Sequence, residues 1–225
     1  VTIFNPSHLG GLFSTFDAQA IGDTEYLTGG FPSHYSGRLS SVLDVRTRPG
    51  SPEFGVMGQI SLLSSKVLVE GSLPFGNSTF LVAGRRTYAD QIIKWFTSSE
   101  LPYYFGDGVA KLAFQLPTGG TLTATGYIGR DVLDWEFEQS NRDVEPVSLR
   151  VDWGNRLLGI NYDDRIFGKP LEMGASVTEF STTVGLFPSF ARIDNDARLF
   201  TAKAALSLSP GRSHDVRVGG GIEDY

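Results

Sequence analysis

The residues best suited to chemistry are three histidines, His8, His34 and His214, which lie far apart in the chain. A metal site would need several of them close to carboxylates, and this spacing does not favour one. Ser33, His34 and Asp44 have the residue types of a nucleophilic triad, but adjacent residues rarely face each other, and no G-x-S-x-G elbow is present. We therefore expect no catalytic residue, no metal, no cofactor and no enzyme activity.

Two other stretches have the composition of ion-binding loops. "RVGGGIE", residues 217–223, is rich in glycine but lies in a strand-like pattern with no helix after it, which disfavours phosphate binding. "RIDNDAR", residues 192–198, has carboxylates at a calcium-like spacing but lacks the full twelve-residue pattern, so we expect a loop tip.

Composition excludes several classes of protein. The 225 residues are 40% hydrophobic and 20% charged, so the chain is not a disordered tail. A net charge of −6 argues against a nucleic-acid partner, which needs a basic face. The absence of cysteine excludes disulfides, thiolate metal sites and cysteine nucleophiles. No run of apolar residues is long enough for a transmembrane helix.

Alternation of apolar and polar residues is the dominant pattern, and it predicts an all-β fold. In "FTAKAALSL", residues 200–208, the aliphatic side chains point one way and Thr201, Lys203 and Ser207 the other. The segments expected to form strands are 55–63, 66–74, 78–87, 105–116, 120–130, 148–163, 171–185, 197–208 and 213–224. Strands of about ten residues suit a tilted membrane crossing. Alternation alone leaves open which face is inside.

The connections between these segments alternate in length. After the first tight hairpin, short turns alternate with longer connections at 88–104, 131–147 and 187–196, the order found in outer-membrane barrels. We expect a short helix within 88–104. In 148–163 the apolar phase changes at Gly154, which predicts a β-bulge there.

Several stretches resemble TonB-dependent outer-membrane receptors of the Bacteroidetes-like branch. They are "NPSHLGGLFSTFDAQAI", "YLTGGFPSHYSGRLSSVLDVRTR", "ISLLSSKVLVEGSLPFGNSTFLVAGRRTYAD", "LPYYFGDGVAKLAFQLP" and "DWGNRLLGINY", in the order of the family. In that family a globular plug precedes a barrel of 22 strands. The resemblance implies a fragment: residues 1–50 as the C-terminal part of a small α+β plug domain, and residues 51–225 as about nine N-terminal strands of a transmembrane antiparallel β-barrel.

The resemblance also implies function and location. A receptor of this kind sits in the bacterial outer membrane and imports a scarce solute with energy from a TonB complex, which acts through a segment absent from this sequence. The expected partners are outer-membrane lipid, the TonB complex and a small solute. A surface lipoprotein remains open as a further partner, and no nucleic-acid partner is expected. Siderophore, vitamin, oligosaccharide and peptide all remain open as the solute.

Specific residues follow from the same likeness and from their positions at the ends of the predicted strands. The loop after a plug strand accounts for one set, expected to be structural: Gly29, Gly30, Pro32, Tyr35, Gly37 and Arg38. Arg85 and Arg86 are expected to join wall and plug, or to meet a lipid headgroup. Five aromatic residues are candidate solute contacts, with packing inside the plug or an interfacial belt as the alternatives: His8, Phe13, Phe16, Tyr103 and Tyr104.

A soluble β-rich binding or adhesion module is the alternative fold and function. It would have shorter strands and would bury the aliphatic face of its sheet. The direction in which that face points therefore separates the two hypotheses.

Overall fold

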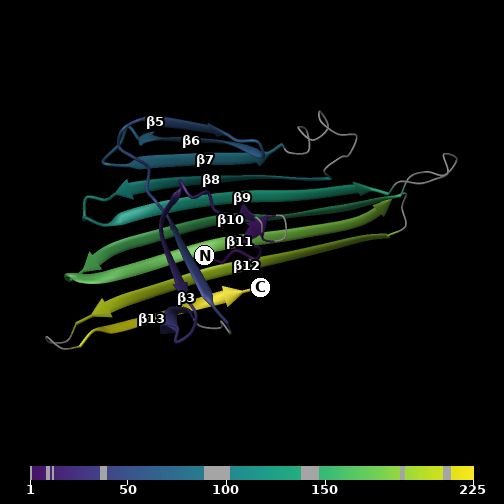
Figure 1. Cartoon of the computed structure of the whole chain (residues 1–225). Helices are drawn as coiled ribbons and strands as arrows, with labels where there is room; N and C mark the ends of the chain where they lie inside the picture. Colours follow the sequence, from purple (N-terminus) through teal and green to yellow (C-terminus); the bar gives the residue numbers. More distant parts are fainter. Residues whose placement is uncertain are drawn as a thin grey trace.

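The protein is all-β, with nine consecutive strands in one antiparallel sheet (Figure 1). The structure is a computed structural model that describes residues 2–8, 11, 13–35, 40–88, 102–137, 147–187, 191–209 and 214–225. The strands of the sheet are β5 (Gly55–Ile60), β6 (Ser64–Ser72), β7 (Thr79–Thr87), β8 (Tyr103–Gln115), β9 (Thr121–Glu136), β10 (Ser148–Ile166), β11 (Lys169–Phe187), β12 (Ala191–Leu208) and β13 (Val216–Asp224). Each strand pairs with its neighbours in sequence, as the nine predicted segments require.

The central strands are longer than the sequence suggested. β10 and β11 have 19 residues each, which at about 3.3 Å per residue is roughly 60 Å of strand. β9 continues to Glu136, and β12 already begins at Ala191. The prediction of a long connection at 187–196 is therefore wrong, and residues 192–198 lie in a strand rather than at a loop tip. The helix expected within 88–104 falls mostly on residues outside those that the structure describes.

The predicted bulge at Gly154 is also wrong. β10 pairs without a register shift on both sides, with Gly154 opposite Arg130 of β9 and Ser181 of β11. A Cβ atom at Gly154 would lie 2.5 Å from the carbonyl oxygen of Gly129, so close backbone approach requires glycine here. The change of phase has another cause, which lies in the two faces of the sheet.

The described residues before the sheet include two small hairpins and a 3-10 turn. The strands are β1 (Ser7–His8), β2 (Phe13–Ser14), β3 (Ile21–Leu27) and β4 (Val42–Thr47), and the turn η2 spans Ser33–Tyr35. We call the described residues from 2 to 47 the N-terminal segment. It contains no α-helix, so the mixed α+β character expected of residues 1–50 is not observed. No helix in the described part of the chain is long and apolar enough to cross a membrane.

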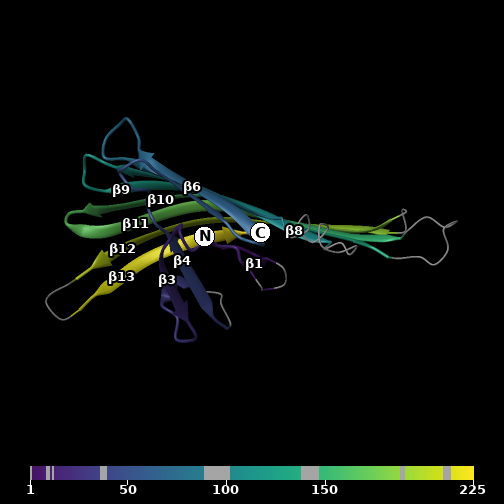
Figure 2. The same cartoon turned by 45° about the horizontal axis from the view of Figure 1, so that its top comes forward.

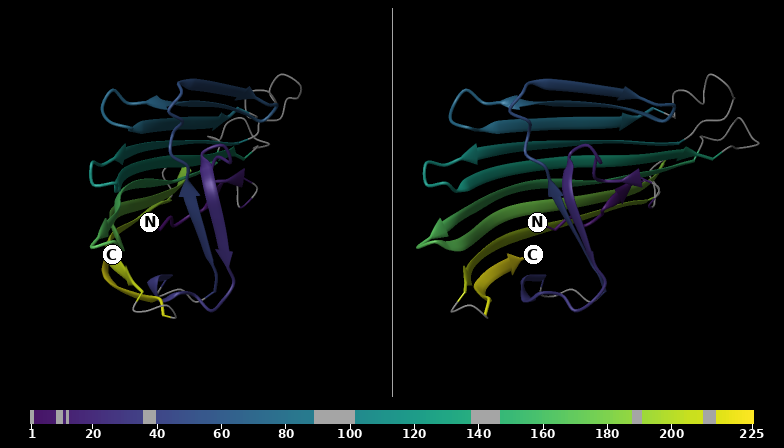
Figure 3. Two further views of the ribbon diagram at one scale, coloured as in Figure 1. Left: turned by 90° about the vertical axis from the view of Figure 1, so that its left-hand side faces the viewer. Right: turned by 60° about the vertical axis from the view of Figure 1, so that its left-hand side comes forward.

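The sheet curves around the N-terminal segment. Figure 3 shows the sheet as a trough, with the β3–β4 hairpin across its open side, and Figure 1 shows that this hairpin runs across the direction of the sheet strands. We call the face that meets the segment the concave face and the other the convex face. Asp107, Asp131 and Asn155 contact the segment, which assigns the odd-numbered residues of β8, β9 and β10 to the concave face.

The convex face carries an exposed belt of large apolar side chains. Strand alternation and register place these residues on it, and each has at least 37% of its surface exposed. We call this set the apolar belt: Val56, Ile60, Val67, Val82, Leu112, Ile128, Leu158, Ile160, Met173, Phe200, Val216, Val218 and Ile222. The aliphatic residues that the sequence placed on one face of each strand therefore do share a face, and it points outward.

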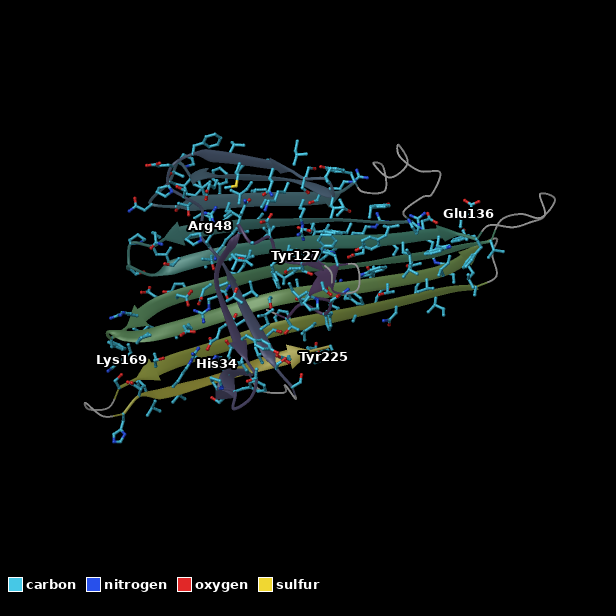
Figure 4. The ribbon with its side chains drawn as sticks, in the orientation of Figure 1. His34, Arg48, Tyr127, Glu136, Lys169 and Tyr225 are labelled. Carbon is cyan, nitrogen blue, oxygen red and sulfur yellow. The ribbon has the colours of Figure 1, made fainter. Side chains whose placement is uncertain are left out.

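Farther along the same face, towards Glu136, charged pairs replace the belt. Arg130 pairs with Asp152, Arg150 with Asp134 and Arg198 with Glu179, all across neighbouring strands. At the same level the apolar residues Leu149, Val151 and Trp153 point to the concave face, by their register with β9 and β11. The polarity of the two faces thus inverts along β10, with charged pairs on the same part of the convex face in β9, β11 and β12, and this inversion explains the phase change at Gly154 (Figure 4 labels Glu136 and, at the other end, Lys169).

Gly50 gives a first stability prediction. The chain passes so close to β7 that a Cβ atom at Gly50 would lie 1.9 Å from the carbonyl oxygen of Phe80. Gly50→Ala should lower the free energy of unfolding by about 1–3 kcal/mol, the usual cost of inserting an atom into a packed site. Gly29→Ala is the control, because its Cβ would meet nothing within 4 Å. Equal free energies of unfolding for both variants in urea titrations would contradict the contact.

The β10–β11 turn gives a second. Phe167 and Gly168 form a two-residue connection with φ of 51° and 74°, the type I′ geometry that favours Asn-Gly. Phe167 is 98% exposed, so its replacement loses no packing. Phe167→Asn should stabilise the protein by about 1 kcal/mol, since left-handed backbone costs a bulky residue 1–2 kcal/mol. Gly168→Ala should have the opposite sign in the same unfolding measurement.

Candidate functional site: a buried polar cluster beneath the N-terminal segment

Five polar side chains from four elements meet where the N-terminal segment rests on the sheet. We call them the polar cluster: His8 from β1, Arg85 from β7, Tyr103 and Asp107 from β8, and Asp131 from β9. The register places them together because Arg85 lies opposite Asp107 and Asp107 opposite Gly129, two residues from Asp131. Figure 4 shows the neighbouring Tyr127 midway along β9, under the segment.

His8 is the centre of the cluster. The residue is 2% exposed, and its ring lies between two carboxylates. Nδ1 is 2.7 Å from Asp131 Oδ2, and Nε2 is 3.4 Å from Asp107 Oδ2 without hydrogen-bond geometry. The imidazole also stacks on Phe105, with ring centroids 4.1 Å apart and planes 6° from parallel. Packing and charge therefore both fix this side chain.

Arg85 links the sheet to the segment. Its Nε donates to Asp107 Oδ2 at 2.8 Å, and its Nη2 donates to the carbonyl oxygen of Ser14 at 2.7 Å. The guanidinium lies 5.0 Å from the centroid of the Phe105 ring, which also stacks with the imidazole of His8. Tyr103 donates its hydroxyl proton to Asp131. The two buried carboxylates are thus met by two basic groups and a hydroxyl.

The electrostatics of the cluster favour a charged histidine. Burial lowers the pKa of His8, but the contacts with Asp107 and Asp131 outweigh it, so the pKa of His8 lies above its ordinary value. A protonated His8 and Arg85 then balance the charges of the two aspartates. Deprotonation would leave two carboxylates facing one cation in a site with almost no water contact.

A second set of contacts fastens the other end of the segment. Arg48 donates Nη2 to Glu70 Oε1 at 3.0 Å and Nε to the carbonyl oxygen of Gln19 at 2.7 Å. Glu70 also accepts from the backbone N–H of Ser51 at 2.8 Å. Lys66 of β6 lies 3.3 Å from Asp17. The chain is therefore fixed to the sheet where it enters β5.

The five residues predicted to contact a solute do not form one site. His8 and Tyr103 are buried in the polar cluster, and Phe13 packs against Phe105 with centroids 5.3 Å apart. Phe16 is half-buried and belongs to the N-terminal segment. Tyr104 lies on the convex face, under the guanidinium of Arg86 at 5.7 Å from the ring centroid. Arg85 and Arg86 accordingly act on opposite faces.

The residues predicted to shape the corner lie after β3. Gly29 and Gly30 form a bend, and Gly30 has a φ of 62°. Pro32 accepts the hydrogen bond from the backbone N–H of Tyr35 at 2.9 Å, which closes the turn η2. Tyr35 donates its hydroxyl proton to Asp44 at 2.6 Å. Gly37 and Arg38 lie outside the described residues.

The structure also shows how the residues of the nucleophilic triad and metal site considered first are arranged. Asp44 contacts Tyr35 and Arg46, while His34 is exposed and its ring packs on Tyr35, so Ser33, His34 and Asp44 form no triad. Within the described ranges, no group of three or more His, Asp or Glu side chains has an arrangement that could hold a metal ion.

Sequence reasoning missed the acidic half of the cluster. Asp107 and Asp131 each interrupt an otherwise weakly polar strand, in "YFGDGVA" and "YIGRDVL". That interruption was a usable signal, because an unpaired carboxylate in mid-strand is costly and implies a partner. The partner itself could not be found by spacing, since His8 is 123 residues from Asp131.

The two adjacent arginines give a matched test of the site. Arg85→Met would leave the buried Asp107 without its strongest partner, so we expect a loss of about 3–5 kcal/mol in the free energy of unfolding. Arg86→Met removes an arginine on the convex face and should cost less than about 1 kcal/mol. Similar losses for both variants in urea titrations would contradict the assignment of Arg85 to the buried cluster.

Comparison with known proteins gives no relative to argue from: a scan against protein-family models, a search of curated proteins and a search of solved structures each found no match.

Proposed function

We propose that the chain is part of an outer-membrane receptor of the TonB-dependent kind, in which the sheet is a section of the transmembrane wall and the N-terminal segment is part of the plug. The receptor would import a scarce solute with energy supplied from elsewhere in the cell. The resemblance of the sequence motifs first suggested this function, and the polarity of the sheet supports it.

The apolar belt is the observation that carries the proposal. Large apolar side chains such as Leu158 and Ile160 are 56% and 50% exposed, and they continue from β5 to β13. Monomeric soluble proteins rarely expose continuous apolar surface on this scale. On β12 the alternating apolar residues that include Phe200 continue to Leu208, a span that at about 3.4 Å per residue is close to the 25 Å height of a lipid-facing band.

The polar character of the concave face supports the proposal that the N-terminal segment is part of a plug. It carries Lys111, Lys203 and Glu172 at the level of the belt, as the interior of a water-filled barrel would. Lys111 donates to the carbonyl oxygen of Thr47, so part of this polar wall already binds the N-terminal segment. A segment held inside a polar interior by hydrogen bonds and ion pairs can block a channel without a continuous apolar core.

The alternative, a soluble β-rich binding or adhesion module, fits the faces less well. Such a module would bury its aliphatic face against a second sheet. In the described part of the chain no second sheet covers the apolar belt, and the two small hairpins lie on the opposite face. Figure 2 shows both hairpins on the same side of the large sheet.

Two neighbouring alanines test the proposal. Ala204 is exposed in the middle of the belt on β12, and Ala205 points to the concave face, opposite Glu172. In protein folded into phospholipid vesicles, Ala204→Arg should lower the free energy of unfolding by about 2–4 kcal/mol, the cost of an arginine at the bilayer midplane. Ala205→Arg should cost clearly less, because its side chain reaches the polar interior and a carboxylate.

A larger loss for Ala205→Arg than for Ala204→Arg would invert the two faces and remove the basis of the proposal. Stable, monomeric protein in plain buffer without detergent would equally favour the soluble module. An uncovered apolar belt is not expected on a soluble monomer.

A further inference from the structure

We infer that His8, held between Asp107 and Asp131, is a proton-controlled latch: its protonated ring fastens the N-terminal segment to the concave face, and loss of the proton releases the described residues 2–8 and 13–17 from the sheet. The latch is defined as His8 with these two aspartates. It concerns the docking of the segment, goes beyond the proposed import of a solute, and does not depend on which solute is carried.

The geometry gives each ring nitrogen an acidic neighbour. Nδ1 contacts Asp131 at 2.7 Å and Nε2 faces Asp107 at 3.4 Å, with both carboxylates at most 5% exposed at the side chain. A protonated ring presents N–H groups to both. A neutral ring keeps only one proton, so the other nitrogen turns a lone pair towards a buried carboxylate, which is repulsive.

Among the residues that the structure describes, the elements around His8 offer no substitute cation. The titratable groups that face His8 are Arg85 from β7, Tyr103 and Asp107 from β8, and Tyr127 and Asp131 from β9. Arg85 is already engaged by Asp107 and the Ser14 carbonyl oxygen. Asp17, farther along the segment, pairs with Lys66 of β6. Loss of one proton therefore leaves an uncompensated negative charge at the centre of the contact.

The pH window follows from linkage. The pKa of His8 is raised in the docked state, so its contribution is complete below about pH 6.5, the value for a free histidine, and disappears as pH rises through the raised value. Between these limits one proton is released on opening. The ratio of open to docked segment should therefore rise by up to tenfold per pH unit, and be constant outside the window.

A single reporter thiol can measure this opening. The 225 residues contain no cysteine, and Thr15, which belongs to the segment, is 1% exposed. Thr15→Cys would be labelled with a maleimide in detergent micelles between pH 6 and 9. Dividing its rate by that of the exposed Ala18→Cys at each pH removes the effect of pH on thiol reactivity. The normalised rate should rise with pH as linkage requires and then level off.

Two histidine variants decide the cause. His8→Gln should make the normalised rate independent of pH, while His34→Gln, which alters an exposed histidine outside the cluster, should leave the rise unchanged. A rate that does not vary with pH in the parent, or a rise that persists in His8→Gln, would overturn the latch. If His8→Gln loses its β-sheet circular dichroism, Asp131→Asn replaces it: the rise should then be complete at lower pH, and an unshifted rise overturns the inference. Labelling reports docking alone, so failure here leaves the proposed import function untouched.

Discussion

Asp107 and Asp131 lie almost out of contact with solvent, and buried carboxylates are tolerated only where cations or donors face them. The sheet supplies Arg85 and Tyr103, but the contact is completed by His8, which comes from another part of the chain. Folding of the sheet and docking of the N-terminal segment are therefore coupled. The same contact positions Phe105, which is fully buried and whose ring contacts both the imidazole and the Arg85 guanidinium.

The faces of the sheet follow a second constraint, because a strand must alternate between two environments. Near the short turns, the convex face is apolar and the concave face polar. Near Glu136 the order is reversed, with ion pairs such as Arg130–Asp152 outside and Trp153 inside. A sheet that stood in a single solvent would have no reason to invert. Two solvents along one strand, lipid and water, account for the inversion under the proposed function.

Much of this architecture could be predicted from local pattern. Alternation identified all nine strands of the sheet and the residues that share a face, because a period of two is written directly in the sequence. It failed at Gly154 and at 187–196, where polar residues on the convex face looked like an irregularity or a loop but belong to strands that continue past the belt. The site could not be derived, since His8, Arg85 and Asp131 meet only through the curvature of the sheet. His8 and Arg85 were both predicted as site residues from the sequence, but their meeting in one cluster was not.

The attachment at Arg48 governs how the segment comes away from the sheet. Arg48, Gln19, Ser51 and Glu70 form one hydrogen-bonded junction next to the start of β5, and the chain continues from it into the sheet. A tension applied at the N-terminal end would reach the contacts one after another, Asn5 with Asn155 first, then His8, then Ser14 with Arg85. Sequential rupture needs far less force than simultaneous shearing of the same bonds. The junction at Arg48 would then remain as a pivot, so the displaced segment stays tethered to the sheet at the start of β5.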